Sequence, residues 1–370
     1  MTVLALPQRQ RAGARLRVDL DAVAANVELL ARRATGELMA VVKADGFGHG
    51  AGAVARTALT HGATRLGVAT IDEALALRAD GIAAPVLSWL NPLDADYATA
   101  GRYGVELAVP SRAHLEAIGR QAPGAAVHLH LDTGLARDGA PPTEWADLCR
   151  AARRAERLGH VQVIGLMGHL ACADVPDDPA NAIGRARFAW GVQTARAAGL
   201  RPVHRHLAAT AATLTDPLSH HTMCRVGAGL VGIDPSGTTR LRPALTLTAP
   251  LVSVRRVTAG TPVGYGHTWT APSATLLGLL PLGYADGLPR AASGRAEVLV
   301  RGQRRPLVGR ISMDMAVVDL GPERPGGPIA GDQVTVFGPG DAGEPTTAEW
   351  AAWADTLEHE IVTGLGARVR

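Results

Sequence analysis

The sequence predicts an α/β fold in which a (β/α)8 barrel, the TIM-barrel architecture, is followed by a mostly β domain. A chain of 370 residues is long enough for two domains, or for one large barrel with an appendage. From about residue 37 to residue 232, eight short apolar runs alternate with segments of helical periodicity, and after residue 243 this alternation stops. Eight alternating units favour a barrel over an open, doubly wound sheet, which remains the alternative.

The eight runs are mostly apolar without strict alternation, which is typical of parallel strands buried on both faces. They span residues 38–44, 65–70, 84–90, 105–109, 127–132, 163–171, 203–209 and 224–232. The clearest helical segments between them are 71–80, 111–121, 143–158 and 180–198, with helix N-caps expected at Ser111 and near Asp94.

The chain from residue 241 to residue 370 predicts the second domain, because short strand-like runs are separated there by turns rich in Gly and Pro. These runs are 244–257, 274–283, 296–301, 306–311, 315–320 and 333–337, and helical content returns at 346–360. We expect the barrel to span residues 16–240, with 16–20 pairing as a strand with the second domain, and residues 1–15 to form a flexible tail.

Composition excludes several classes of protein. The net charge of +3 is spread along the chain without basic blocks, which argues against nucleic-acid binding. No apolar run is long enough to span a bilayer and the N-terminus lacks a signal-peptide core, so we expect a cytoplasmic protein with no membrane association. Cys149, Cys172 and Cys224 lack metal-ligand spacing, so we expect reduced thiols and no metal site.

Lys43 is the only lysine among 37 basic residues. Arginine replaces lysine at little cost on a solvated surface, so a lysine that persists suggests a role that a guanidinium cannot fill. An amine can lose its proton near neutral pH and form an imine, whereas arginine stays protonated. Chance survival of a single lysine is the alternative explanation.

Reactive residues follow several of the predicted strands, where barrel enzymes place their active sites. The loops after the seventh and eighth strands, which often bind phosphate, carry Thr210 and the glycine-rich segment 225–229. Lys43 follows the first strand. An amine on the same barrel mouth as a phosphate site is the arrangement that pyridoxal 5′-phosphate requires.

Seven motifs in this sequence then resemble those of the alanine racemases, pyridoxal phosphate enzymes of fold type III, in the same order. They are MAVVKADGFGHG (39–50), DTGLARDG (132–139), GLMGHLACAD (165–174), RVGAGLVGIDP (225–235), VGYGHTW (263–269), PLGYADG (281–287) and SMDM (312–315). The resemblance extends over residues 17–368, including the β domain.

The resemblance implies a racemase with two catalytic bases. Lys43 would form the Schiff base with the cofactor and act as the base on one face of the substrate. Tyr265 would be the opposing base, reaching the site from the second subunit of a homodimer. Racemisation needs both, because one base removes the Cα proton and the other returns it to the opposite face.

The resemblance also assigns substrate contacts. Arg137 would orient the substrate carboxylate close to the cofactor phenolate, and Met313 would contact the substrate across the dimer. Tyr284 and Asp174 resemble residues of the corridor that leads to the site.

The remaining motif residues would hold the cofactor. His169 would pack on the pyridine ring, and Arg225 would donate to the ring nitrogen and keep it unprotonated, which restrains side reactions. Thr210, Gly227 and Ala228 would hold the phosphate.

Without the resemblance, several of these residues have ordinary structural explanations. His169 on an apolar strand would be a hydrogen-bonded buried histidine, and Tyr265 and Tyr284 would be core rings with solvated hydroxyls. With or without the resemblance, Asp132 is better explained as a structural cap of its loop than as a catalyst.

The sequence departs from the family pattern around the phosphate. Phe47 stands where many relatives have tyrosine, and Ala367 stands where some place a phosphate-binding tyrosine. The usual Asn-Ser pair after the seventh strand reads Ala209-Thr210. Each lost hydrogen bond is worth on the order of 1 kcal/mol, which predicts weaker retention of the cofactor.

His130 stands where many relatives have a carbamylated lysine. Since Lys43 is the only lysine, that modification cannot occur here. Either His130 positions Arg137 differently, or a chloride ion or a water molecule substitutes for the carbamate. Ser312 replaces a cysteine of some relatives, with little expected effect.

The first functional hypothesis is an alanine racemase that supplies D-alanine for peptidoglycan. A racemase acting on another small amino acid such as serine is the closest alternative, because the changes at Phe47, His130 and Ala209 leave room for it. A homologue that binds the cofactor without turnover and a decarboxylase of the same fold are further alternatives.

Overall fold

The computed structural model describes residues 13–369, and the chain divides into two compact units. One unit is Leu20–Pro243, and the other contains Ala244 onward together with the described residues up to Asp19. Residues 1–12 of the predicted tail lie outside the described residues. The last residue of that predicted tail, Arg15, is instead the first residue of strand β1.

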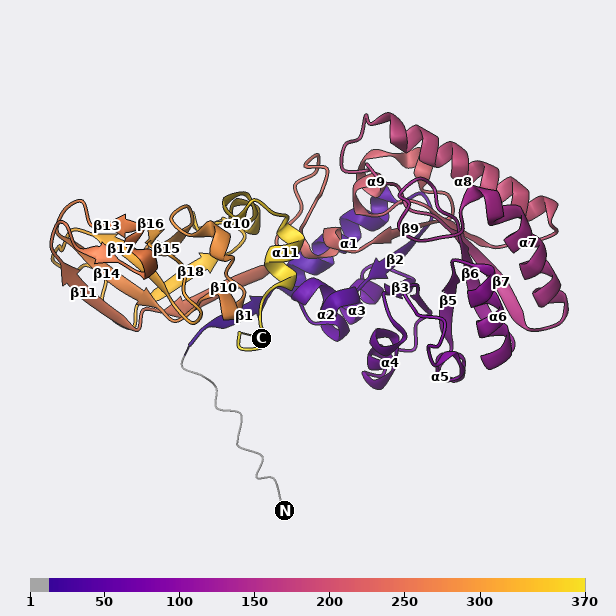
Figure 1. Cartoon of the computed structure of the whole chain (residues 1–370), viewed down its shortest axis with the longest axis horizontal. Coiled ribbons are helices and arrows are strands. Elements are labelled where there is room, and N and C mark those ends of the chain that lie inside the picture. The colour runs from indigo at the N-terminus through magenta and orange to yellow at the C-terminus, as the bar shows by residue number, and fades with distance from the viewer. Residues whose placement is uncertain (1–12, 370) are drawn as a thin grey trace, which may run out of the picture. The chain divides into compact units, whose positions relative to one another are not determined.

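The Leu20–Pro243 unit is the predicted barrel of parallel strands (Figure 1). Its strands are β2 (Glu37–Val41), β3 (Arg65–Val68), β4 (Val86–Ser88), β5 (Val105–Val109), β6 (Ala125–His130), β7 (Val161–Met167), β8 (His204–His206) and β9 (Met223–Val226). They pair in the order β8-β7-β6-β5-β4-β3-β2-β9. The Thr222 amide donates to the Arg205 carbonyl at 3.0 Å and the Arg225 amide to the Ala208 carbonyl at 2.9 Å, which brings β8 and β9 together and closes the ring.

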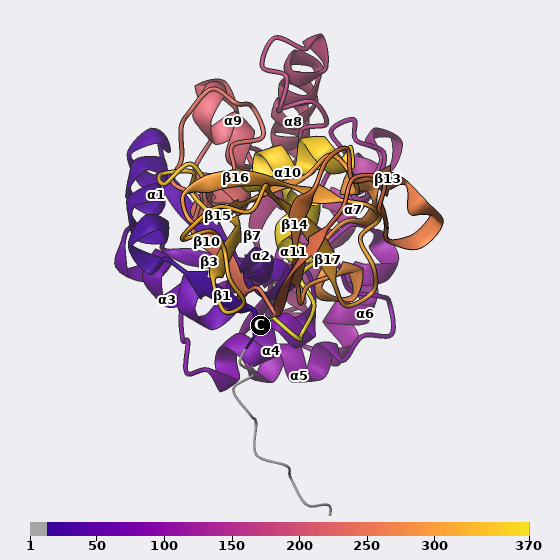
Figure 2. The same cartoon turned by 90° about the vertical axis from the view of Figure 1, so that its left-hand side faces the viewer.

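Helices surround these strands, and Figure 2 shows α1 and α3–α9 following one another around them. The helices are α1 (Leu20–Arg33), α2 (Lys43–Gly48), α3 (Ala51–Thr60), α4 (Ile71–Ala79), α5 (Tyr97–Arg102), α6 (Arg112–Gln121), α7 (Pro142–Arg157), α8 (Pro179–Ala197) and α9 (Thr210–Thr215), with short 3-10 turns η1 (Pro217–Ser219) and η2 (Ala228–Val231). Ser111 caps α6 by accepting from the His114 amide at 3.3 Å. The cap expected near Asp94 is Asp96, which accepts from the Thr99 amide at 2.8 Å.

Apolar side chains from five strands fill part of the barrel interior. Met39, Leu87, Ala108, Met167 and Met223 form one buried cluster. Because these strands are spread around the ring, their side chains can meet only inside it, which makes the barrel a packed core rather than a pore. The sequence prediction of a barrel is therefore confirmed, and the open-sheet alternative is wrong.

The other unit is a twisted antiparallel sheet with two helices, as the sequence predicted for the C-terminal part. Its sheet order is β1-β10-β18-β15-β16-β17-β14-β11, with a separate β12-β13 hairpin. The bounds are β1 (Arg15–Val18), β10 (Leu245–Pro250), β11 (Ser253–Val257), β12 (Pro262–Val263), β13 (Trp269–Thr270), β14 (Thr275–Leu280), β15 (Glu297–Val300), β16 (Gln303–Val308), β17 (Ala316–Gly321), β18 (Gln333–Phe337), α10 (Thr347–Ala354) and α11 (Glu358–Thr363), with 3-10 turns η3 (Tyr265–His267), η4 (Tyr284–Asp286) and η5 (Arg290–Ala292).

This unit differs from the sequence prediction in several details, and the predicted run 244–257 is two strands, β10 and β11. The early strand is Arg15–Val18 rather than residues 16–20, and it pairs antiparallel with β10. The helical stretch 346–360 is two helices, because Asp355 after α10 takes a left-handed conformation with φ of 56° and ends that helix. Along residues 13–369, no helix is long and apolar enough to cross a membrane.

Candidate active site

The chain makes a left-handed turn directly after β2, starting at Lys43. Four successive residues, Ala44 to Phe47, have φ between 51° and 61°. Three of them are not glycine, and each such residue costs about 1–2 kcal/mol relative to a right-handed turn. Side chains hold the turn in place: Glu73 Oε1 accepts from the Ala44 amide at 2.7 Å and Asp45 Oδ1 accepts from the Ala51 amide at 2.9 Å. Strain of this kind persists where the surrounding structure fixes it, as at functional sites.

Lys43 follows β2 directly and feels the charges of one positive and one negative group. Burial and then the charge of Arg137 lower the pKa of the Lys43 amine, while Glu73 acts in the opposite direction. The net direction is downward, so the amine loses its proton more readily than an exposed lysine would. The structure thus brings Lys43 and Arg137 together, although they follow different strands.

Arg225 and His169 form the neighbouring part of the barrel mouth. Arg225 Nη2 donates to the Gly168 carbonyl at 2.7 Å and lies 3.2 Å from His169 Nδ1. Burial and then the charges of Arg225 and Arg137 lower the pKa of His169 to about 3, so its imidazole is neutral. Burial lowers the pKa of Arg225 to about 10, which still leaves the guanidinium charged at neutral pH. A neutral ring beside a fixed cation suits packing against an aromatic cofactor.

The predicted phosphate site is a compact backbone cradle. Thr210 Oγ1 accepts from the backbone amides of Gly227 at 3.3 Å and Gly229 at 3.2 Å, which ties the start of α9 to η2. A Cβ atom at Gly227 would lie 2.7 Å from Cε2 and Cζ of Phe47, and one at Gly229 would lie 2.9 Å from Thr210 Cγ2. Both positions therefore need glycine, and Ala228 between them is buried.

His130 and Asp138 lie beside Arg137. His130 Nδ1 is 3.4 Å from Asp138 Oδ2, a contact too long for a good hydrogen bond, and both groups line a cavity of about 20 Å³ together with Arg137 and His169. Burial opposes ionisation of Asp138, but the imidazole of His130 and the Gly139 amide outweigh it, so the pKa of Asp138 is lowered. The cavity has room for about one small group such as a water molecule.

The DTG segment is structural, as expected for Asp132. Asp132 Oδ1 accepts from the Gly134 amide at 2.8 Å and the Ala136 amide at 3.1 Å, which closes the loop. The next residue, Thr133, has a role that the sequence interpretation missed. Its hydroxyl donates to the His169 carbonyl at 2.6 Å and accepts from the His169 amide at 3.2 Å, so it fixes the backbone of the histidine.

In the other unit, the three predicted residues Tyr265, Tyr284 and Met313 are all exposed. The amide of Tyr284 donates to the carbonyl of Ser312 at 3.0 Å, so the loops that carry Tyr284 and Met313 lie side by side. Tyr265 is 73% exposed at the tip of the β12-β13 hairpin.

The C-terminal turn of this unit contacts the same loops through ion pairs. Arg368 pairs with Asp286 at 2.8 Å and with Asp314 at 2.6 Å. Its neighbour Ala367 is exposed. In the barrel unit, Asp174 is exposed in the loop after β7.

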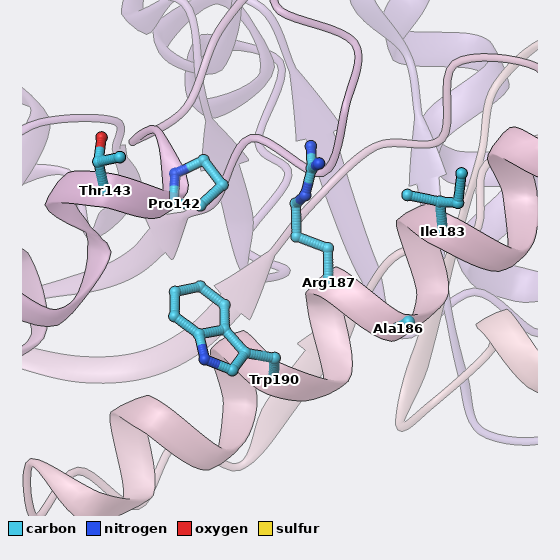
Figure 3. A pocket seen from close by; sticks show the side chains of 6 residues that line it. All are labelled: Pro142, Thr143, Ile183, Ala186, Arg187 and Trp190. Atoms are coloured by element: carbon cyan, nitrogen blue, oxygen red, sulfur yellow. The ribbon is translucent and has the colours of Figure 1, made fainter.

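A larger hollow of about 550 Å³ lies away from these groups, between the start of α7 and helix α8. Figure 3 shows its lining: Trp190, Arg187, Ile183 and Ala186 from α8 face Pro142 and Thr143. None of the predicted site residues lines it, and it is mostly apolar.

Comparison with known proteins decides the family. Residues 18–235 match the family described as "Alanine racemase, N-terminal domain" and residues 244–370 match "Alanine racemase, C-terminal domain". The chain belongs to the alanine racemase family.

Similar members of the alanine racemase family cover almost the whole chain. The chain is 45% identical to an alanine racemase of Thermobifida fusca over 96% of each protein, and 46% identical to one of Mycolicibacterium smegmatis over 98% of this chain and 95% of the relative. Among solved structures, alanine racemase from D-cycloserine-producing Streptomyces lavendulae has a TM-score of 0.93 at 42% identity, covering 96% of each chain. An alanine racemase from Bartonella henselae, solved with covalently bound pyridoxal phosphate, has a TM-score of 0.87 at 26% identity, covering 97% of this chain and 98% of that one.

Glu73 is a further residue of this candidate site, and a sequence signal for it was available. It forms a capping box with Thr70, whose hydroxyl accepts from the Glu73 amide at 3.2 Å. The pattern Thr-x-x-Glu before an apolar helical segment is visible in the sequence. The Glu73 carboxylate also accepts a hydrogen bond from the Ala44 amide and raises the pKa of Lys43. One residue therefore caps α4 and supports the turn that begins at Lys43.

Proposed function

We propose that this chain interconverts L-alanine and D-alanine with pyridoxal 5′-phosphate as cofactor. The observation that carries the proposal is the position of Lys43, the only lysine, with a lowered pKa at the barrel mouth that also contains Arg137, His169 and Arg225. Its membership of the alanine racemase family and its near-complete match to relatives named alanine racemase support the same reaction.

The residues present fit the cofactor. Lys43 supplies an amine with a lowered pKa, and the cradle of Thr210, Gly227 and Ala228 offers backbone groups and a hydroxyl to a phosphate. Arg225 would face the pyridine nitrogen and His169 the ring. Bound there, pyridoxal phosphate supplies an electron sink for the charge that develops at the substrate Cα.

The protein's own groups would then move the proton. Lys43 Nζ would accept or return a proton on one face of Cα, which its lowered pKa favours. Tyr265 would serve the opposite face through its hydroxyl. Arg137 would hold the substrate carboxylate by its guanidinium, and Met313 would line the space for the small side chain.

We further propose a homodimer in which the unit from Ala244 onward provides Tyr265 and Met313 to the Leu20–Pro243 barrel of the partner subunit. Tyr265, Tyr284 and Met313 are exposed on one chain, which is expected of groups that are covered only by another surface. A role in supplying D-alanine for peptidoglycan in the cytoplasm follows from this reaction as part of the proposal.

A racemisation assay tests the proposal. Purified protein with added pyridoxal phosphate is expected to form D-alanine from L-alanine, measured by chiral chromatography. K43R, which keeps the positive charge but cannot form an imine, is expected to be inactive, and Y265F is expected to lose most of its activity. If L-serine turns over faster than L-alanine in the same assay, the substrate assignment is wrong while the reaction class stands.

A further inference from the structure

A line of buried polar side chains from several barrel strands ends at Arg225. Arg65 at the start of β3 pairs with Glu106 of β5. Glu106 Oε2 lies 3.1 Å from His128 Nε2, and His128 Nδ1 lies 2.8 Å from His206 Nε2. His206 Nδ1 in turn lies 2.9 Å from Arg225 Nη1.

The two ends of this line fix the direction of every hydrogen bond in it. A guanidinium can only donate, so His206 Nδ1 must accept from Arg225. A neutral imidazole then carries its proton on Nε2, and His206 must donate to His128 Nδ1. By the same rule His128 carries its proton on Nε2 and donates to Glu106, whose ionised carboxylate can only accept. Both histidines are therefore the Nε2–H tautomer.

Burial protects this arrangement. His128 and His206 are fully buried, and Glu106 and Arg65 are 8% and 9% exposed. A Cβ atom at Gly165 would lie 1.9 Å from His128 Nδ1, so the glycine leaves the space that the imidazole occupies. Burial lowers the pKa of both histidines, and the imidazole of His128 helps to lower the pKa of Glu106 against the opposing effect of its burial. Near neutral pH, the rings are neutral and the carboxylate is charged.

We propose that Glu106 and His128 are positioning residues which, through His206, hold the Arg225 guanidinium in one orientation toward the cofactor ring. This inference rests on the proposed function, because Arg225 matters to catalysis only if the ring lies against it. Chains of hydrogen bonds in a low-dielectric interior strengthen one another, and the carboxylate at the far end favours donation along the whole line. The line that fixes Arg225 therefore includes groups from four other strands, β3, β5, β6 and β8. Arg65 of β3 neutralises the carboxylate.

The tautomers provide a test that does not depend on activity. In cofactor-loaded protein labelled with ¹⁵N-histidine, two-bond ¹H–¹⁵N correlations separate the Nδ1–H, Nε2–H and doubly protonated forms. We expect His128 and His206 to be the Nε2–H form at pH 7. Each signal is assigned by its disappearance when that histidine alone is substituted. An Nδ1–H tautomer or an imidazolium at either position would overturn the proposal, whether or not the protein racemises alanine.

A matched pair of substitutions tests the effect on the site. H128M leaves the buried Nε2–H of His206 without an acceptor, and kcat is expected to fall about tenfold with KM within about twofold, together with a shifted visible absorption band of the cofactor. H204M makes the same change in the half-buried ring that stacks 6.0 Å from His128 outside the line, and should leave kcat and the band unchanged.

E106Q is a second test of the proposal in case H128M does not fold. It keeps an oxygen acceptor for His128 but removes the charge, so a smaller fall of about fivefold in kcat is expected. A purely structural role would lower the melting temperature without moving the absorption band or kcat. Folded H128M or E106Q with an unchanged band and unchanged kcat would contradict the proposal, while loss of racemisation in the wild type would contradict only the proposed function.

Discussion

The glycine at position 227 offers a quantitative test of the cradle. Gly227 has φ of −124°, outside the left-handed region that favours glycine, so the space around the residue is the feature to test. Its Cβ would lie 2.7 Å from the buried ring of Phe47 and 3.2 Å from Val41 Cβ, so the ring must move. Overpacking of this kind costs typically 1–3 kcal/mol.

The expected loss can be measured by thermal and denaturant unfolding. For a unit of this size, about 2 kcal/mol corresponds to a fall in melting temperature of roughly 4–8 °C. The double variant F47L/G227A, in which the side chain that meets the new methyl group is smaller, should recover most of the loss relative to F47L alone. If G227A is as stable as the wild type, or if F47L does not relieve it, the close packing of Phe47 on the cradle is not what requires glycine.

Three further predictions concern the site. E73Q removes the charge that holds up the pKa of Lys43, so the acid limb of the pH–rate profile should move to lower pH; movement to higher pH would refute the assignment. T210V removes the hydroxyl that accepts from Gly227, and the cofactor dissociation constant should rise about tenfold while T210S restores it. The pKa of His169 is about 3 in the folded protein and 6.5 in the unfolded chain, so the unfolded state binds the proton first as pH falls. The free energy of unfolding should therefore decrease as pH drops below 6.5. Denaturant unfolding from pH 7 to pH 4 measures this dependence, which H169N should make less steep.

The order of strands and helices could be predicted because hydrophobic pattern and length carry that information. All eight barrel runs correspond to strands, and the predicted helix ends agree within a residue or two at α4, α6, α7 and α8. The break at Asp355 was not predictable from periodicity, because the apolar spacing continues through it. The short β12-β13 hairpin was missed because two-residue strands leave no pattern.

The site was predictable only in part. Lys43, Thr210 and Arg225 follow predicted strands and could be placed at one barrel mouth, whereas the assignment of Tyr265 and Met313 depends on resemblance. The interior line could not be read from the sequence, since His128 and His206 are 78 residues apart and meet because β6 and β8 both pair with β7 in the folded sheet. Polar residues inside otherwise apolar strands were the available signal, and Glu106 in the run VELAV is the clearest case.

The two-base assignment is the central claim, and exchange of the Cα proton tests it directly. In D2O, wild-type protein should incorporate deuterium at Cα of alanine whichever enantiomer is supplied, with both enantiomers appearing among the products. Y265F should retain exchange on one enantiomer only, since Lys43 still serves its own face, while formation of the opposite enantiomer is lost. Racemisation by Y265F at the wild-type rate, or exchange of both enantiomers in K43R, would contradict the account.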